Sequence, residues 1–277
     1  MKDKLYPCLW FDGKAKEAAT HYSSVFENAK ILSENPMVVM FELEGMQFMG
    51  LNGGPLFKIN PSISFFVFGD SVEDIDKKWK QLSAGGSVLM PLDKYPWNEK
   101  YGWCQDKFGV NWQLMMNPGA EQKIVPSFMF TQHQSGKAEE AINFYTSIFK
   151  NSNVGMISRY EKGEPDVEGY IKHARFTLNG QAFAAMDSSG PHAFTFNEGI
   201  SMVVPCDNQE EIDYYWNKLT EGGKESQCGW LKDKFGVSWQ IVPAILGKLM
   251  SDPAKGKRVM DVVMKSVKFN IEELENA

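Results

Sequence analysis

The stretch YGWCQDKFGVNWQL, residues 101–114, decides the fold, because it returns as CGWLKDKFGVSWQI at residues 228–241. Three further pairs of segments match in the same order: 15–26 with 138–149, 41–55 with 176–191, and 73–86 with 210–223. Four ordered matches indicate an internal duplication. We therefore predict two tandem domains, 1–116 and 123–243, with a linker at 117–122 and a C-terminal helical extension at 244–277.

Each repeat shows strand and helix patterns in a fixed order. In repeat 1, alternating apolar and aromatic residues predict strands at 5–11, 29–34, 37–43, 46–51, 62–68, 87–90, 101–105 and 110–116. Apolar residues at helical spacing predict one helix at 13–26 and a second from Asp70-Ser71, which can cap it, to Gly85-Gly86, which can end it. Each repeat is therefore a pair of β-α-β-β-β units, and the fold class is α+β.

The tail lies outside the duplication. It predicts two helices, 244–251 and 253–268, separated at Asp252-Pro253 because proline disfavours a continuous helix. An apolar stripe on the second helix predicts that the tail packs on the body of the protein or on a second subunit, with a specific partner-binding helix as the alternative.

Composition excludes several classes of protein. The formal net charge of −6 argues against nucleic-acid binding, which normally needs a basic surface. No apolar run approaches the roughly 20 residues that a membrane helix needs, and the N-terminus lacks the apolar region of a signal peptide. The four cysteines are scattered without a C-x-x-C pair. We therefore predict a cytoplasmic protein with reduced thiols and with neither nucleic acid nor membrane as a partner.

Several segments resemble the vicinal oxygen chelate superfamily, which contains glyoxalases, bleomycin-resistance proteins and extradiol dioxygenases. They are LWFDGKAKEAATHYSSVF (9–26), FMFTQHQSGKAEEAINFYTSIF (128–149), KHARFTLNGQAFAAMD (172–187) and both DKFGVxWQ segments. The most similar branch is PhnB-like, often labelled 3-demethylubiquinone-9 3-methyltransferase. The resemblance implies paired units that build a U-shaped sheet around a cleft. It also implies that the fused copies form an internal pseudo-dimer, with a homodimer as a further possibility.

Metal-dependent members of that superfamily hold their ion with His, Gln or Glu side chains on the first and last strands of the units. Here the resemblance places the following residues at those positions: Tyr6 and Val125, Gln113 and Gln240, Ser62 or Ile63, Gly199 or Ile200, and Met49 with Ala184. One neutral amide per cleft does not hold a divalent ion tightly, because such sites use about three imidazole, carboxylate or thiolate ligands. We therefore predict no metal and no cofactor, with a divalent metal as the alternative.

Strand periodicity selects candidate ligand-binding residues. Gln113 and Gln240 are candidate amide anchors for a ligand, with a structural hydrogen bond across the sheet as the alternative. Tyr6, Cys8 and Trp10 share one face of the first strand, and we expect that face to line the cleft with Gln113. Trp112 and Trp239 have the opposite parity to the two glutamines, which predicts that both indole rings lie in the core.

A polar set occurs only in repeat 2. His173 and Arg175 lie on one predicted strand, and Asp187 follows after the next turn. Two interpretations stay open: the three converge as an acid–base or anion-binding group, with His173 and Asp187 as catalytic candidates and Arg175 as a ligand-binding residue, or His173 is a structural histidine whose hydrogen bonds are satisfied on its strand. Repeat 1 has Val38, Val39-Met40 and Asn52 in the corresponding region, so it lacks this set.

Three functions remain open from the sequence. The first is binding of a small amphipathic or aromatic molecule in a cleft without a metal triad. The second is a metal-dependent enzyme of the glyoxalase or dioxygenase type. The third is an S-adenosylmethionine-dependent methyltransferase, as the branch label suggests, but no G-x-G-x-x-G loop lies between a strand and a helix.

Overall fold

The computed structural model describes residues 5–277, and these divide into two compact units. One unit runs from Pro7 to Ile200, and the other contains Ser201–Ala277 together with Leu5 and Tyr6. The units therefore do not follow the boundary between the two sequence repeats, because most of repeat 1 and the first half of repeat 2 share one unit. None of the helices in residues 5–277 is both long enough and apolar enough to cross a membrane.

The larger unit contains an eight-stranded sheet built from both repeats, which we call the central sheet. Repeat 1 supplies four strands: β5 (Ile63–Gly69), β6 (Ser87–Tyr95), β7 (Asn98–Gln105) and β8 (Asn111–Met116). Repeat 2 supplies the others: β9 (Ile124–Phe130), β10 (Asn153–Arg159), β11 (Ile171–Leu178) and β12 (Gln181–Asp187). Their order is β10-β11-β12-β9-β5-β8-β7-β6.

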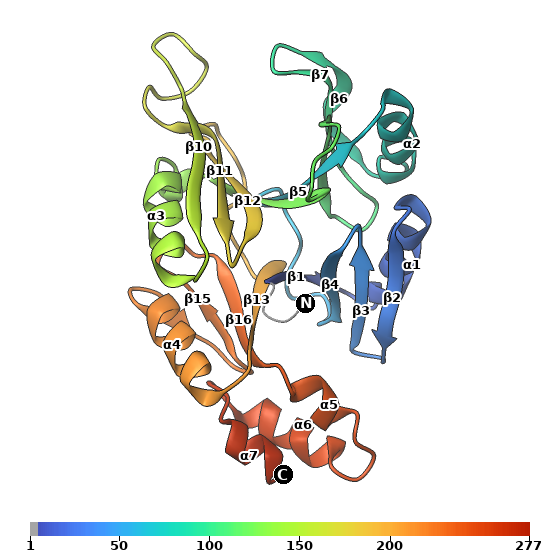
Figure 1. Cartoon of the computed structure of the whole chain (residues 1–277), viewed down its shortest axis with the longest axis vertical. Coiled ribbons are helices and arrows are strands. Elements are labelled where there is room, and N and C mark those ends of the chain that lie inside the picture. Colours follow the sequence, from blue (N-terminus) through green and yellow to red (C-terminus); the bar gives the residue numbers. More distant parts are fainter. Residues whose placement is uncertain (1–4) are drawn as a thin grey trace. The chain divides into compact units, whose positions relative to one another are not determined.

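The two repeats join where β5 and β9 run antiparallel, with Phe66 opposite Val125. Two helices cover one face of the central sheet: α2 (Val72–Leu82) packs on β5, β7 and β8, and α3 (Ala138–Ile148) packs on β9, β11 and β12 (Figure 1). A short 3-10 helix, Gln132–Gln134, precedes α3. The opposite face of the sheet carries no helix of this unit.

The first half of repeat 1 also lies in the larger unit. It contains β1 (Tyr6–Phe11), α1 (Ala15–Val25), β2 (Ala29–Glu34), β3 (Val38–Leu43) and β4 (Met46–Asn52), in the strand order β1-β4-β3-β2. β1 and β4 are parallel, with Cys8 opposite Met49. The helix α1 packs its buried side chains on β2, β3 and β4.

The smaller unit holds the second half of repeat 2 and the tail. Its strands are β13 (Ile200–Cys206), β14 (Lys224–Glu225), β15 (Trp230–Lys232) and β16 (Ser238–Pro243), and its helices are α4 (Gln209–Thr220), α5 (Leu246–Met250), α6 (Gly256–Lys265) and α7 (Ile271–Glu275). Backbone N–H groups of Cys228 and Gly229 donate to Ser266 and Val267, so the tail packs on this unit as predicted. The third helix, α7, was not predicted.

The repeated motif forms the same buried turn in both units. The carboxylate of Asp106 accepts hydrogen bonds from the backbone N–H groups of Phe108 and Val110 and from the indole of Trp112. Asp233 does the same with Phe235, Val237 and Trp239. Both tryptophans are fully buried, as predicted from their parity.

The fold class is α+β, as predicted, and most strands and helices lie where the patterns place them. The clearest difference is β6, predicted at 87–90 but observed to Tyr95. Pro91, Asp93 and Lys94 made this stretch resemble a loop. Irregular pairing between β6 and β7 accommodates them, and β6 is an edge strand, where proline is tolerated.

Candidate functional site

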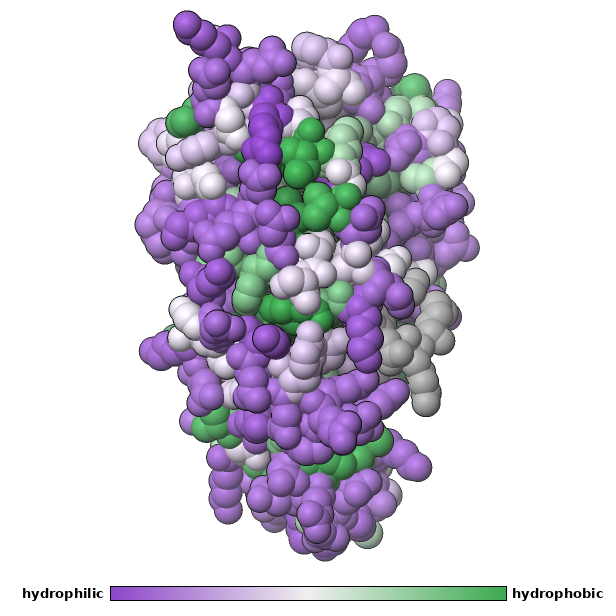
Figure 2. Space-filling view, turned by 60° about the vertical axis from the view of Figure 1, so that its left-hand side comes forward, coloured by the Kyte–Doolittle hydropathy of each residue, from purple (hydrophilic) through white to green (hydrophobic). Residues whose placement is uncertain are grey.

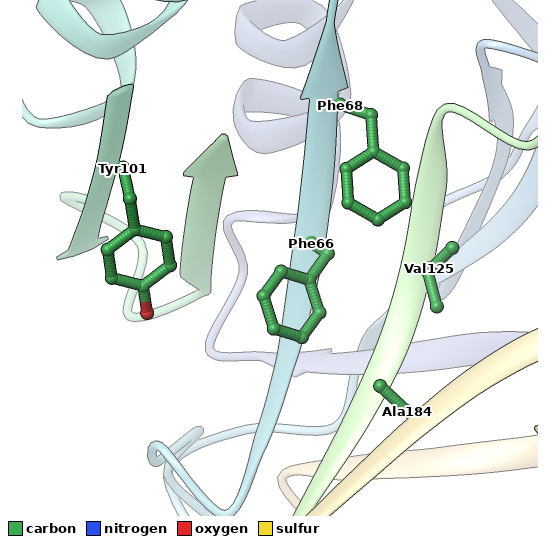
Figure 3. Packing of buried hydrophobic residues seen from close by; sticks show 5 residues of the cluster. All are labelled: Phe66, Phe68, Tyr101, Val125 and Ala184. Carbon is green, nitrogen blue, oxygen red and sulfur yellow. The ribbon is translucent and has the colours of Figure 1, made fainter. Parts of the chain in front are cut away.

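The central sheet has two chemically different faces because strand side chains alternate. On β5, the ring of Phe65 lies 5.4 Å from that of Trp112, in the core beneath the helices. Phe66 and Phe68 have the opposite parity, so they lie on the other face, together with the cluster residues labelled in Figure 3. We call this second face the inner face.

The inner face carries a cluster of buried apolar side chains from four strands. Figure 3 shows five of its residues on β5, β7, β9 and β12: Phe66, Phe68, Tyr101, Val125 and Ala184. Partly buried residues pack against them, namely Met90, Tyr95, Trp103, Met115, Ala120, Ala182 and Met186. Because methionine side chains are flexible, a surface of this composition can adapt its shape to a small molecule.

A hydrogen-bonded chain crosses the inner face at Gln113. The amide of Gln113 donates to the hydroxyl of Ser64 at 2.8 Å and accepts from the hydroxyl of Tyr101 at 2.7 Å. All three side chains are buried. Gln113 therefore already makes the structural hydrogen bond across the sheet that the sequence left as the alternative to a ligand anchor, and burial raises the pKa of the Tyr101 hydroxyl.

Two further polar atoms of the inner face are buried without a hydrogen-bond partner in residues 5–277. They are the indole Nε1 of Trp103 and the hydroxyl of Ser127. Trp103 belongs to β7 and lies opposite Gln113 of β8, and Ser127 belongs to β9 and lies opposite Ala184 of β12. Because buried polar groups are normally satisfied, each atom is a position where a ligand group would supply a missing hydrogen bond. The strands β5 and β8 lie between the two atoms, so they are separate positions on the inner face.

His173 and Arg175 reach the same face from β11. The imidazole of His173 meets the ring of Phe66 edge-on at 5.6 Å, and the guanidinium carbon of Arg175 lies 5.2 Å from the ring centre of Phe68. Burial lowers the pKa of His173 to about 4, and the charge of Arg175 adds to the shift. His173 is therefore neutral at pH 7, whereas Arg175 is charged and exposed.

The structure does not bring Asp187 to this group. Its carboxylate accepts hydrogen bonds from the backbone N–H groups of Gly136, Ala138 and Ile171, and Ala138 is the first residue of α3. Asp187 thus lies on the helix side of β12, and its oxygens hold the start of the helix. The predicted convergence with His173 fails because the two side chains have opposite parity in the sheet.

The first strand lies apart from Gln113. Tyr6, Cys8 and Trp10 belong to β1, which pairs with β4, whereas Gln113 belongs to β8, which pairs with β5 and β7. Cys8 is fully buried. The indole of Trp10 donates to the carbonyl of Gly54 at 2.8 Å, so the chain itself fills the space around this ring. The expected common face of β1 and Gln113 is therefore not observed.

Gln240 lies in the smaller unit, on β16. Its amide donates to the hydroxyl of Ser201 at 2.9 Å, the counterpart of the bond between Gln113 and Ser64. Gln240 therefore lies in a different sheet from Arg175, the other candidate ligand-binding residue of repeat 2.

The inner face does not fit a divalent metal ion. Of the positions that the resemblance assigned to metal ligands, Val125, Ala184 and Gln113 do come together here, and Ser64 takes the place expected for Ser62 or Ile63. They supply one amide and one hydroxyl, which bond to each other. Among residues 5–277, no group of three or more His, Cys, Asp or Glu side chains is arranged to hold a metal ion.

Sequence reasoning missed most of the inner face. Phe66 and Phe68 lie in the apolar run SISFFVF, and the strand it forms is buried on both faces. A continuous apolar run shows no alternation, so the sequence does not distinguish the two faces of this strand. Tyr101 and Trp103 lie within the duplicated motif itself. Their parity with Gln113 was the available signal, but it needed the pairing of β7 with β8 to be useful.

Comparisons with known proteins agree with this architecture. A family model described as 3-demethylubiquinone-9 3-methyltransferase matches twice, at residues 3–115 and 122–242. The PhnB protein from Bacillus cereus is 34% identical over a match that covers 40% of this chain and 98% of that chain, with a TM-score of 0.39. No match was found among curated proteins.

Glyoxalase I from Zea mays matches across both repeats. It is 12% identical, the match covers 87% of this chain and 93% of that chain, and the TM-score is 0.59. At this identity the similarity shows the fold. Because the family model covers most of the chain, this protein belongs to the PhnB-like 3-demethylubiquinone-9 3-methyltransferase family and has the glyoxalase fold in a tandem form.

Proposed function

We propose that this protein binds a small amphipathic or aromatic molecule on the inner face of the central sheet. The observation that carries the proposal is the combination of a buried aromatic and methionine cluster with two unpartnered polar atoms, Trp103 Nε1 and Ser127 Oγ. Small-molecule sites are typically apolar with a few placed polar groups. A ligand that inserts between the methionines would gain apolar contact, and a polar group on it would satisfy one of these atoms.

Two segments beside the inner face, each longer than its counterpart in the other repeat, support the same location. In repeat 1, residues 87–100 separate Gly86 from Tyr101, whereas in repeat 2 only residues 224–227 separate Gly223 from Cys228. The longer segment forms the β6–β7 hairpin, which carries Met90 and Tyr95 to the cluster.

The second of these segments belongs to repeat 2. Residues 150–175 separate two matched segments of repeat 2, and only residues 27–40 separate their counterparts in repeat 1. The longer segment forms β10 and the loop that connects it to β11. In Figure 1 this loop lies at the same end of the larger unit as the β6–β7 hairpin. Each repeat is thus extended only where it contributes to the central sheet.

The outer surface is less suited to a large apolar partner. On the face drawn in Figure 2, hydrophobic residues reach the surface in separate patches among hydrophilic ones. Leu56 and Met264 are the most exposed apolar side chains and lie on separate segments, whereas the exposed Trp97 packs on Tyr95 and Tyr101 of the inner-face cluster. Scattered apolar residues are normal for a protein surface, so the clustered inner face is the stronger candidate.

The proposal is for binding, because nothing observed in residues 5–277 favours methyl transfer or metal-dependent chemistry on this face. We also propose that the protein acts in the cytoplasm. All four cysteines are unpaired, and three are buried, which fits a reducing compartment.

A matched pair of tryptophan variants tests the site. N-phenyl-1-naphthylamine is neutral and fluoresces more strongly in apolar surroundings, and we expect it to bind the wild-type protein. Trp103→Ala should weaken this binding about 10-fold or more, the scale of losing one buried aromatic contact. Trp230→Ala, at the equivalent position of β15, is the control and should leave binding unchanged.

Two results would contradict the proposal. One is the absence of any saturable probe binding to the folded wild-type protein. The other is equal loss of binding in both variants, which would place the probe elsewhere. Circular dichroism of each variant checks that the fold is retained.

A further inference from the structure

Arg175 is an exposed cation beside the aromatic cluster and makes no ion pair within residues 5–277. Two other cations on the strands β10 and β11 do form ion pairs. Arg159 of β10 binds the carboxylate of Glu139 at 2.6 Å, and Lys172 of β11 is paired with Glu164. Arg159 and Lys172 therefore each form an ion pair with an acid, whereas Arg175, which points to the inner face, does not.

The guanidinium of Arg175 lies over the ring of Phe68, and Phe68 is stacked on Phe66 with ring centres 6.1 Å apart. A guanidinium fixed over an aromatic ring keeps its hydrogen-bond donors free at its edge. That edge matches the two oxygens of a carboxylate, which it can bind with two parallel hydrogen bonds.

The neighbouring polar groups also favour a ligand that accepts hydrogen bonds. The unpartnered Nε1 of Trp103 can only donate. His173 is uncharged at neutral pH because burial and Arg175 lower its pKa to about 4, so it adds no second charge. The inner face therefore offers one cation over the stacked phenylalanine rings of β5 and one unpartnered indole donor two strands away on β7.

We propose that the natural ligand of the inner face is an aromatic carboxylate, with its ring against Phe66 and Phe68 and its charge on Arg175. This inference rests on the proposed function, since it names the chemical class of ligand for the same site. In repeat 1, Met40 and Val38 correspond to Arg175 and His173, so the duplication provides a natural uncharged replacement for each.

The test compares three probes of the same shape: 1-naphthoate, 1-naphthamide and 1-naphthylmethylamine. Binding to the full-length protein at pH 7 is measured by calorimetry. We expect naphthoate to bind about 10-fold or more tightly than naphthamide, the scale of a charge-assisted hydrogen bond, and the cationic amine to bind most weakly. In Arg175→Met the three affinities should become similar, whereas naphthamide binding should change little.

Arg258→Gln is the matched control. It removes one guanidinium from helix α6, where Arg258 donates to the carbonyl of Ala277, and gives the same net charge as Arg175→Met. It should retain the preference for naphthoate. Arg175→Lys keeps the charge without the planar donor pair and should give an intermediate preference.

The outcomes separate this inference from the proposed function. Equal affinity for naphthoate and naphthamide in the wild type, with both lost in Trp103→Ala, would overturn the anion preference while leaving the binding site in place. A preference for naphthoate that persists in Arg175→Met would also overturn the inference. Failure of all three probes to bind the folded protein would overturn both proposals.

Discussion

The segments β5–β8 and β13–β16 are duplicates that share a scaffold but differ in what surrounds it. Both contain the buried aspartate turn and both contain a glutamine that donates to a serine, Gln113 to Ser64 and Gln240 to Ser201. These bonds are internal to each segment. They explain why the duplicated motif keeps its sequence without requiring that either copy binds a ligand.

The differences lie around the glutamine. Tyr101 donates a second hydrogen bond to Gln113, but its counterpart in repeat 2 is Cys228. A Cβ at Gly102 would lie 2.9 Å from the backbone of Leu92 in the long hairpin, whereas one at Gly229 would lie 2.5 Å from the ring of Phe269 in the tail. The hairpin and the tail therefore cover equivalent glycines. The long hairpin adds aromatic side chains to the inner face, and the tail adds a structural cover.

The largest expected effect tests the shared scaffold. Asp106→Ala and Asp233→Ala should each lower the free energy of unfolding by about 3 kcal/mol or more, because each leaves several buried donors without an acceptor. Calorimetric or denaturant unfolding measures the loss. The exposed Asp70→Ala, which removes a surface ion pair with Lys123, should lower stability far less than either buried substitution, because exposed ion pairs contribute little. Tolerance of one buried substitution and not the other would contradict the common role.

The next effect distinguishes His173 from its apolar counterpart in repeat 1. The unfolded chain protonates this histidine below about pH 6.5, but the folded protein does so only near pH 4, so folding excludes a proton between these values. Relative to His173→Val, the wild type should therefore lose about 2 kcal/mol of stability between pH 7.5 and pH 5. Unfolding curves at the two pH values measure this. A stability difference that stays constant with pH would contradict the burial of a neutral imidazole.

The smallest effect concerns the tyrosine that only one segment has. Tyr101→Phe removes the hydroxyl that donates to Gln113 and should lower the free energy of unfolding by about 1 kcal/mol. Cys228→Ser at the equivalent position touches no such bond and should change stability less. Thermal unfolding of the pair gives the comparison, and an equal loss in both variants would show that the Tyr101 bond has no special role.

The sequence predicted the local elements well because the duplication sampled each pattern twice. The helices of the repeats, most strands and the burial of Trp112 and Trp239 follow from local periodicity and capping residues, whereas α7 was not predicted. The assembly of β5–β8 with β9–β12 does not follow from periodicity. We expected Trp10 to line a cleft with Gln113, and Asp187 to converge with His173, because the sequence patterns were read within each repeat by itself.

The candidate site was predicted only in part, because sequence patterns place a residue on a strand but do not show how strands of different repeats pair. His173 and Arg175 do share a face, since they are two residues apart on one strand. Asp187 lies beyond a turn, where one residue of register decides the face, and it faces α3 instead. The contacts with Phe66 and Phe68 join strands from different repeats, and no local pattern encodes such a pairing.

We expect ligands to bind the inner face of the central sheet and not the equivalent segment of the smaller unit. Fluorine NMR of the protein labelled with 5-fluorotryptophan tests this directly, because its eight tryptophans give separate probes. Single Trp→Phe variants assign the signals. On addition of N-phenyl-1-naphthylamine, we expect a saturable shift of the Trp103 resonance and no shift for Trp230 or Trp239. A shift confined to Trp230, with Trp103 unchanged, would contradict it.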